Sequence, residues 1–187
     1  MNLNSYFSDF NDVLTRCLDD AGHRKGLEGA VKMLKATKKG KTKIILVGNG
    51  GSSAIAEHMA IDLTKNAGLR AIAISGTPTL TTFANDFGYE KVYQKAIEAF
   101  ADAGDVLIAI SSGGTSKNIL NAVAAAKRKK MKVITFSGFD KGNPLSKSGD
   151  INLWVDSRAF GYVEMIHNLL IHYINDAIIG KAEYMIR

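Results

Sequence analysis

The chain has 187 residues, of which 46% are hydrophobic, and a formal net charge of +6. A chain of this length fits one domain and buries about 70% of the surface that its unfolded form exposes, so it needs no disulfide or metal to fold. Its single cysteine, Cys17, excludes an internal disulfide, no secretory leader is recognisable, and no apolar run reaches the ~20 residues of a membrane helix. We therefore expect a cytoplasmic protein that does not enter a membrane.

The cationic residues gather in two stretches, residues 32–43 and 127–132, each just before a predicted strand. Cations near helix C-termini complement the helix dipole and face water. Nucleic-acid surfaces usually interleave cations with aromatic residues, which neither stretch does. We therefore interpret both stretches as solvated helix ends and expect no nucleic-acid partner.

Two helices are predicted before the first strand. Apolar residues recur at helical spacing from Tyr6 to about Lys38, with a break near Ala21 and Gly22. A doubly wound sheet reserves no face for helices that precede its first strand, so we interpret residues 1–38 as a helical extension used for oligomerisation. The alternative is that these helices cover the sheet.

Strands alternate with helical patterns over residues 43–155, which form a βα core. The predicted strands are residues 43–47, 71–75, 106–110, 133–137 and 151–155. Such alternation predicts an α/β fold, a three-layer αβα sandwich around a five-stranded parallel sheet. Thr77 is expected to cap a helix that has Pro78 at its first position, and a last helix over residues 161–180 is expected to end at Gly180.

Two loops rich in Ser, Thr and Gly follow the first and third strands, at residues 49–53 and 111–116. The glycines at the first loop approach a dinucleotide fingerprint, but the third glycine of that motif would fall at Ser53 and no acid ends the next strand. Backbone N–H groups, hydroxyls and a helix N-terminus favour an anion without any lysine. One such loop could be an ordinary helix cap. Two loops on neighbouring strands predict a phosphate-bearing ligand.

Candidate proton-transfer groups lie on two helices. His58 and Asp62 stand at i and i+4 after the first loop, so they share a face. On the last helix Glu164 and His172 are about 80° apart, whereas His167 and His172 differ by about 140°. Glu164 can therefore face one pocket with either histidine. Two histidines and two carboxylates could bind a divalent metal or perform acid and base work, unless His167 or His172 is a buried core residue.

Four ordered segments resemble the sugar isomerase (SIS) family. These are GNGGS after the first strand, ANDFGYE at residues 84–90, ISSGGTS after the third strand and KVITFSG at residues 132–138. The similarity runs from about residue 7 to 180 and is strongest to the phosphoheptose isomerases. It implies one SIS domain over residues 1–187 with a flavodoxin-like fold, assembled into a homotetramer. It also implies conversion of sedoheptulose 7-phosphate to D-glycero-D-manno-heptose 7-phosphate, a step in the biosynthesis of lipopolysaccharide or capsule.

The resemblance also implies roles for residues of this sequence. The phosphate would be held by Ser111, Ser112 and Ser116, and the sugar by Asn49, Gly50, Gly51, Ser52 and Asp86. One zinc ion per subunit would be bound by His58, Asp62, Glu164 and His172. Isomerisation through an enediolate needs a base, an acid and a positive charge, so Asp62 or Glu164 would be the base and His172 the acid.

Three residues depart from the phosphoheptose isomerase pattern. Asp62 stands where glutamate is typical, Glu164 where glutamine is typical, and Gly113 where a serine grips the phosphate. All three fall within the inferred site, so the sequence leaves open that the substrate is a different sugar phosphate. The alternative function is a non-catalytic SIS protein that binds a sugar phosphate or a protein partner, as the DnaA-binding initiator-associating relatives do. The cluster of histidines and carboxylates favours catalysis.

Overall fold

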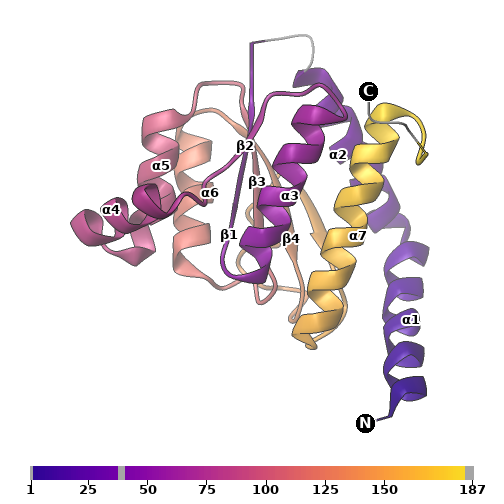
Figure 1. Cartoon of the computed structure of the whole chain (residues 1–187). Helices are drawn as coiled ribbons and strands as arrows, with labels where there is room; N and C mark the ends of the chain where they lie inside the picture. The colour runs from indigo at the N-terminus through magenta and orange to yellow at the C-terminus, as the bar shows by residue number, and fades with distance from the viewer. Residues whose placement is uncertain (1, 38–40, 184–187) are drawn as a thin grey trace.

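The computed structural model describes residues 2–37 and 41–183 (Figure 1). Within these residues, strands pair into one parallel sheet in the order β2-β1-β3-β4-β5. The strands are β1 (Ile44–Gly48), β2 (Ala71–Ala73), β3 (Val106–Ser111), β4 (Lys132–Ser137) and β5 (Ile151–Trp154). The predicted five-stranded parallel sheet is thus confirmed. This strand order is the flavodoxin-like one, in which ligands bind at the carboxyl ends of β1 and β3.

Helices cover both faces of the sheet (Figure 1). They are α1 (Leu3–Asp19), α2 (Ala21–Thr37), α3 (Gly51–Lys65), α4 (Thr77–Phe87), the short 3-10 helix η1 (Tyr89–Lys91), α5 (Val92–Phe100), α6 (Lys117–Arg128) and α7 (Phe160–Ile179). Figure 1 shows α2, α3 and α7 on one face and α4, α5 and α6 on the other. The arrangement is the predicted αβα sandwich.

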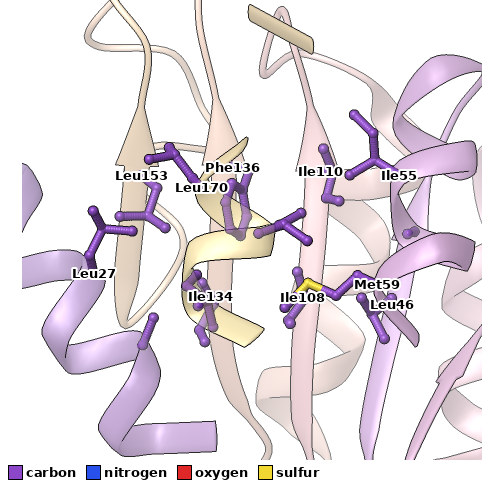
Figure 2. Packing of buried hydrophobic residues seen from close by; sticks show 14 of the residues in the cluster. Leu27, Leu46, Ile55, Met59, Ile108, Ile110, Ile134, Phe136, Leu153 and Leu170 are labelled. Carbon is purple, nitrogen blue, oxygen red and sulfur yellow. The ribbon is translucent and has the colours of Figure 1, made fainter. Parts of the chain in front are cut away.

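The central strands are buried on both faces, which explains their continuous apolar runs. Alternate residues point to opposite faces, so Leu46 packs under α3 and α7 while Ile45 packs under α5 and α6. Figure 2 shows the first of these cores, in which Leu27 of α2 lies beside Leu153 of β5. Because the two cores hold the strands in register, the strand ends are fixed positions for a site.

The other predicted strand ends agree with the structure to within one residue, but β2 and the start of α4 differ in ways that have a physical reason. The strand predicted to reach residue 75 ends at Ala73, because β2 is an edge strand with only three residue pairs to β1. The N-cap residue of α4 is Gly76 instead of Thr77. Thr77 is already helical, so Pro78 lies in the first turn of the helix. Gly180 does end α7, with a left-handed φ of 97°.

The two N-terminal helices differ from each other in packing. α2 covers the sheet, because its residues Leu27, Ala30 and Leu34 are buried in the core. The alternative interpretation therefore holds for α2. α1 extends beyond the layered body (Figure 1) and leaves Leu3 and Phe7 exposed. Residues 38–40, which include part of the first cationic stretch, lie outside the described residues.

A search of the described helices for a segment that could span a bilayer finds none long and apolar enough.

Candidate active site

The two predicted anion-binding loops lie side by side at the carboxyl edge of the sheet. β1 and β3 are paired in parallel, and Gly48 stands opposite Ile110. α3 begins at Gly51 and α6 at Lys117, so the N-termini of both helices lie at this edge. The partial positive charges of these two helix N-termini favour an anion between the loops.

The turn after β1 depends on glycine at two positions. Gly50 has a φ of 54°, in the region where a side chain is strained. A Cβ on Gly48 would lie 2.5 Å from the backbone carbon and oxygen of Ser52. The chain can therefore turn tightly enough to bring Asn49 and Ser52 to the same edge as the second loop.

A hollow of about 390 Å³ lies between these loops, and we call it the phosphate hollow. Six predicted site residues line it: Asn49, Ser52, Ser111, Ser112, Ser116 and Glu164. Phe139, Asp140 and Phe160 also line it, and the sequence analysis did not predict them. For Phe139 a signal existed, since it lies just beyond the carboxyl end of β4 and this end of a parallel sheet is where sites form.

The hydroxyls of the second loop are not used as helix caps. Ser116 is the N-cap residue of α6, yet its side chain makes no capping hydrogen bond, and Ser111 Oγ donates to Ser116 Oγ at 3.2 Å. Ser112 is only 5% exposed, and its Oγ has no hydrogen-bond partner among the described residues. A buried hydroxyl without a partner is costly, and a bound phosphate oxygen would supply one.

Glu164 lies at the boundary between the phosphate hollow and α3. Its carboxylate packs so closely on Gly51 that a Cβ there would lie 2.5 Å from Glu164 Oε2. Gly51 is the first residue of α3, where the helix dipole favours negative charge. Glycine at this position is therefore what admits the carboxylate to the helix N-terminus.

A second group of polar side chains lies further along α3 and α7. His58 Nε2 is 3.5 Å from Asp62 Oδ2, and His172 Nδ1 is 3.8 Å from the same oxygen. The two imidazole rings meet edge to face, with centroids 5.0 Å apart. The other carboxylate oxygen, Asp62 Oδ1, accepts from Asn66 Nδ2 at 3.1 Å, which orients Oδ2 toward the histidines.

These three residues offer the ligands of a metal site. One potential ligand atom from each of His58, Asp62 and His172 lies within 4.8 Å of the others. Ligand atoms of a tetrahedral zinc, at bond lengths of about 2.0 to 2.2 Å, lie about 3.4 Å apart, so small side-chain movements would close the set. Two imidazoles and one carboxylate are a known donor set of catalytic zinc. We call these residues the His-Asp-His cluster, and its donors fit zinc.

Glu164 is not part of this cluster among the described residues. It precedes His172 by eight positions on α7, which is about 12 Å along a helix axis. Glu164 therefore lines the phosphate hollow, whereas His172 belongs to the neighbouring His-Asp-His cluster.

His167 is a core residue. Its side chain is fully buried beside Phe136, and its Nε2 lies 3.1 Å from the carbonyl oxygen of Ser137. Burial lowers the pKa of His167 to about 4, so the imidazole is neutral near pH 7. Of the two histidines on α7, only His172 reaches the cluster.

Asp86 is not among the residues that line the phosphate hollow. It is exposed near the end of α4, where it accepts a hydrogen bond from Asn85 Nδ2 at 2.9 Å. From the same segment, Tyr89 reaches the first loop instead, because its hydroxyl donates to Asn49 Oδ1 at 3.0 Å. No local sequence signal predicted this contact, which joins residues forty positions apart.

The SIS-domain family profile matches residues 5–138 of this chain. The chain belongs to the SIS-domain family. A phosphoheptose isomerase from Proteus mirabilis is 39% identical over 180 residues, 92% of each chain. One from Helicobacter pylori is 40% identical and covers 83% of this chain and 87% of its own.

Solved SIS-domain structures have the same architecture. A phosphoheptose isomerase from Francisella tularensis has a TM-score of 0.88 and 30% identity, covering 95% of this chain and 96% of that one. One from Neisseria gonorrhoeae has a TM-score of 0.87 and 31% identity, covering 94% and 95%. The SIS fold and the resemblance to phosphoheptose isomerases inferred from the sequence are thus confirmed.

The three departures from the phosphoheptose isomerase pattern occupy three different surroundings. Asp62 belongs to the His-Asp-His cluster, and Glu164 lies against the start of α3. Gly113 lies in the wall of the phosphate hollow, where an added Cβ would meet Phe139 Cδ2 at 3.6 Å, an ordinary contact distance. A serine at this position would therefore fit.

Proposed function

We propose that this chain catalyses the aldose–ketose isomerisation of a sugar phosphate, converting sedoheptulose 7-phosphate to D-glycero-D-manno-heptose 7-phosphate. The observation that carries the proposal is the placement of the phosphate hollow beside the His-Asp-His cluster on the same two helices, α3 and α7. A sugar phosphate has its anion at one end and its carbonyl at the other. The names of relatives about 39% identical over most of the chain support the same reaction.

The chemistry assigned to these residues is a proton transfer between adjacent carbons. A carboxylate removes the proton from the carbon beside the carbonyl, while an acid protonates the carbonyl oxygen, which gives an enediol. Returning a proton to the former carbonyl carbon, and removing one from the hydroxyl of the carbon that was first deprotonated, gives the isomer. His172 is the proposed acid, and Asp62 or Glu164 the proposed base.

We propose that His58, Asp62 and His172 hold zinc. Zinc in this place would supply positive charge for the oxygen of the enediolate. With Asp62 and His172 as zinc ligands, Glu164 is the carboxylate left for proton transfer, and the positive charge takes the place of the acid at the carbonyl oxygen. Both histidine side chains are partly exposed, at 56% for His58 and 41% for His172, so a substrate can reach the cluster.

We further propose a cytoplasmic homotetramer that acts in lipopolysaccharide or capsule synthesis. Exposed apolar residues on α1 and α7 support self-association, since Leu3, Phe7 and Leu169 are all more than 40% exposed. The buried thiol of Cys17 forms no disulfide, as is usual for cysteines in a reducing compartment.

The decisive experiment is proton exchange during turnover. The purified protein with zinc is incubated with sedoheptulose 7-phosphate in deuterated water, and the sugar is followed by NMR and mass spectrometry. We expect one deuterium on carbon in the aldose product. Sedoheptulose without phosphate is the control and should exchange far more slowly, because it lacks the group that the hollow binds.

Two other results would change the assignment. Exchange into a different ketose phosphate, with none into sedoheptulose 7-phosphate, would refute the heptose substrate. Tight binding of sugar phosphates without exchange or turnover would refute the isomerase and support the non-catalytic SIS protein.

A further inference from the structure

Asn49, in the wall of the phosphate hollow, belongs to a set of side-chain hydrogen bonds that joins three elements. Its Nδ2 donates to Asn118 Oδ1 at 3.0 Å, and Asn118 Nδ2 donates back to Asn49 Oδ1 at 2.8 Å. The hydroxyl of Tyr89 donates to the same Asn49 Oδ1 at 3.0 Å. The loop after β1, the first turn of α6 and η1 therefore meet at one amide.

The direction of these hydrogen bonds is fixed by the backbone. The N–H of Ile119 can only donate; it donates to the carbonyl oxygen of Ser116 at 3.1 Å and also lies 3.0 Å from an atom of the Asn118 side chain, so that atom is the acceptor Oδ1. Asn118 Nδ2 is then the atom that faces Asn49, and its partner there must be an acceptor. This fixes Asn49 Oδ1 opposite Asn118 Nδ2, and Tyr89 can only donate to it.

The side-chain oxygen of Asn49 therefore has no lone pair left to accept a hydrogen bond from a substrate. A carbonyl oxygen has two lone pairs, and Asn118 and Tyr89 occupy both on Asn49 Oδ1. Its Nδ2 has two hydrogens, and only one has a partner among the described residues. The side chain therefore presents the phosphate hollow with a single N–H.

We propose that Asn49 binds the substrate only as a hydrogen-bond donor, to a carbonyl, enediolate or phosphate oxygen, and that Asn118 and Tyr89 are the positioning residues that fix this polarity. The proposal rests on the proposed function. A donor held in place before the substrate arrives stabilises a developing negative charge without reorganisation. Asn118 is suited to hold it, because it is 3% exposed and its amide is fixed at both ends.

A purely structural role for Asn118 is the competing explanation, since its Oδ1 also accepts an N–H in the first turn of α6. The two explanations differ in one measurable respect. A positioning residue loses its effect on catalysis once Asn49 is gone, whereas a structural residue affects catalysis with or without Asn49.

A double-mutant cycle separates these explanations. kcat and KM for sedoheptulose 7-phosphate are measured for wild type, Asn49→Ala, Asn118→Ala and the double variant, together with thermal unfolding. We expect Asn118→Ala to lower kcat/KM about tenfold in the wild-type background and less than twofold in the Asn49→Ala background. A loss confined to kcat identifies the carbonyl or enediolate oxygen, and a rise in KM alone identifies the phosphate.

Two further variants keep the test informative if Asn118→Ala unfolds. Asn118→Asp retains the acceptor for the N–H of Ile119 and for Asn49 Nδ2 but loses the donor to Asn49 Oδ1. Tyr89→Phe removes only the hydroxyl of a side chain that is 60% exposed, so the fold should be unaffected. Each should lower kcat/KM severalfold, Tyr89→Phe with unchanged thermal unfolding, and neither should do so in the Asn49→Ala background.

Asn121→Ala is the matched control, because Asn121 also lies on α6 and donates to the carbonyl oxygen of Glu90, outside the hollow. It should leave kcat/KM within twofold of wild type. Additive losses in the cycle would overturn the polarity proposal while wild-type turnover still supports the isomerase. Absence of any turnover or exchange by wild type would instead refute the proposed function and this proposal with it.

Discussion

Gly113 is a residue at which the phosphate hollow has room for one more hydroxyl. Its added Cβ would meet Phe139 and Thr115 only at 3.6 Å or more, and its φ is not in the left-handed region. We expect Gly113→Ser to lower KM for the sugar phosphate about fivefold, because one new hydrogen bond to phosphate contributes about 1 kcal/mol. kcat should change little, since the phosphate is bound equally before and during the reaction. Steady-state kinetics measure both constants.

Gly142→Ser is the matched control for this change. Gly142 lies in a loop outside the hollow, and an added Cβ would meet only the end of the Lys147 side chain, at 3.5 Å. The control should leave KM unchanged. A KM for Gly113→Ser equal to that of wild type or higher would contradict a phosphate bound at the second loop.

His167 gives the stability of the protein a pH dependence. Burial lowers its pKa to about 4 in the folded protein, whereas an unfolded histidine has a pKa near 6.5. The unfolded state therefore binds more protons between these values, so stability is fully present above pH 6.5 and is lost as the pH falls toward 4. From pH 7 to pH 5 we expect a loss of about 2 kcal/mol in the free energy of unfolding, measured by urea titration.

His167→Gln removes this titration while keeping an N–H donor for the carbonyl oxygen of Ser137, because the glutamine Nε2 has the reach of the histidine Nε2. The variant should be less stable than wild type at pH 7 but should lose about 2 kcal/mol less on going to pH 5. A smaller slope of the same sign remains from His23, whose pKa burial also lowers. An unchanged slope in His167→Gln would show that this residue does not titrate on unfolding.

At the scale of elements, the His-Asp-His cluster joins α3 to α7, so a metal there would hold the two helices together. A ligand that binds only the folded state adds about 2.7 kcal/mol to stability at a hundredfold excess over its dissociation constant. We expect zinc to raise the Tm of wild type by several degrees and a chelator to reverse the rise. Asp62→Asn should show little of either effect.

The control for Asp62→Asn is Asp19→Asn, on α1. Asp19 is exposed and pairs only with Arg24 among the described residues, so its variant should respond to zinc as wild type does. Equal stabilisation of Asp62→Asn and wild type would place the zinc elsewhere. Metal content after dialysis, measured by mass spectrometry, gives an independent readout.

The elements predictable from the sequence are those whose signal is local. Strands β1 and β3 are buried on both faces and are therefore continuous apolar runs, and His58 and Asp62 share a helix face through their spacing alone. The separation of Glu164 from His172 was harder to predict. The angle between two residues around a helix axis does not show how far apart they lie along that axis. The contacts of Asn49 with Asn118 and Tyr89 arise only when three elements meet, so no local pattern predicts them.

At the scale of the whole molecule, α1 leaves large apolar side chains exposed, as α7 also does. Phe7 is 53% exposed on a helix that extends beyond the sandwich. We expect Phe7→Glu to reduce the mass of the proposed tetramer in light scattering, because a buried charge at a subunit interface is costly. The individual chain should remain folded by circular dichroism.

Phe100→Glu provides the comparison, since Phe100 is 48% exposed on α5, on the opposite face of the sheet. This variant should keep the mass of wild type. Dissociation by Phe100→Glu but not by Phe7→Glu would move the interface to the other face, and a monomeric wild type would remove the tetramer altogether.

Because α7 follows every other helix and strand of the described chain, it is the last of these elements to leave the ribosome during synthesis. The phosphate hollow's two loops and α3 emerge well before α7, and at 5 to 20 residues per second His172 follows Asp62 by roughly 5 to 20 seconds. The nascent sheet could therefore already contain both anion-binding loops while it has neither Glu164 nor His172. A chain stopped before Phe160 would also leave bare the core face that Val163, Ile166 and Leu170 cover, so this face of the sheet is completed only after the last helix has been made.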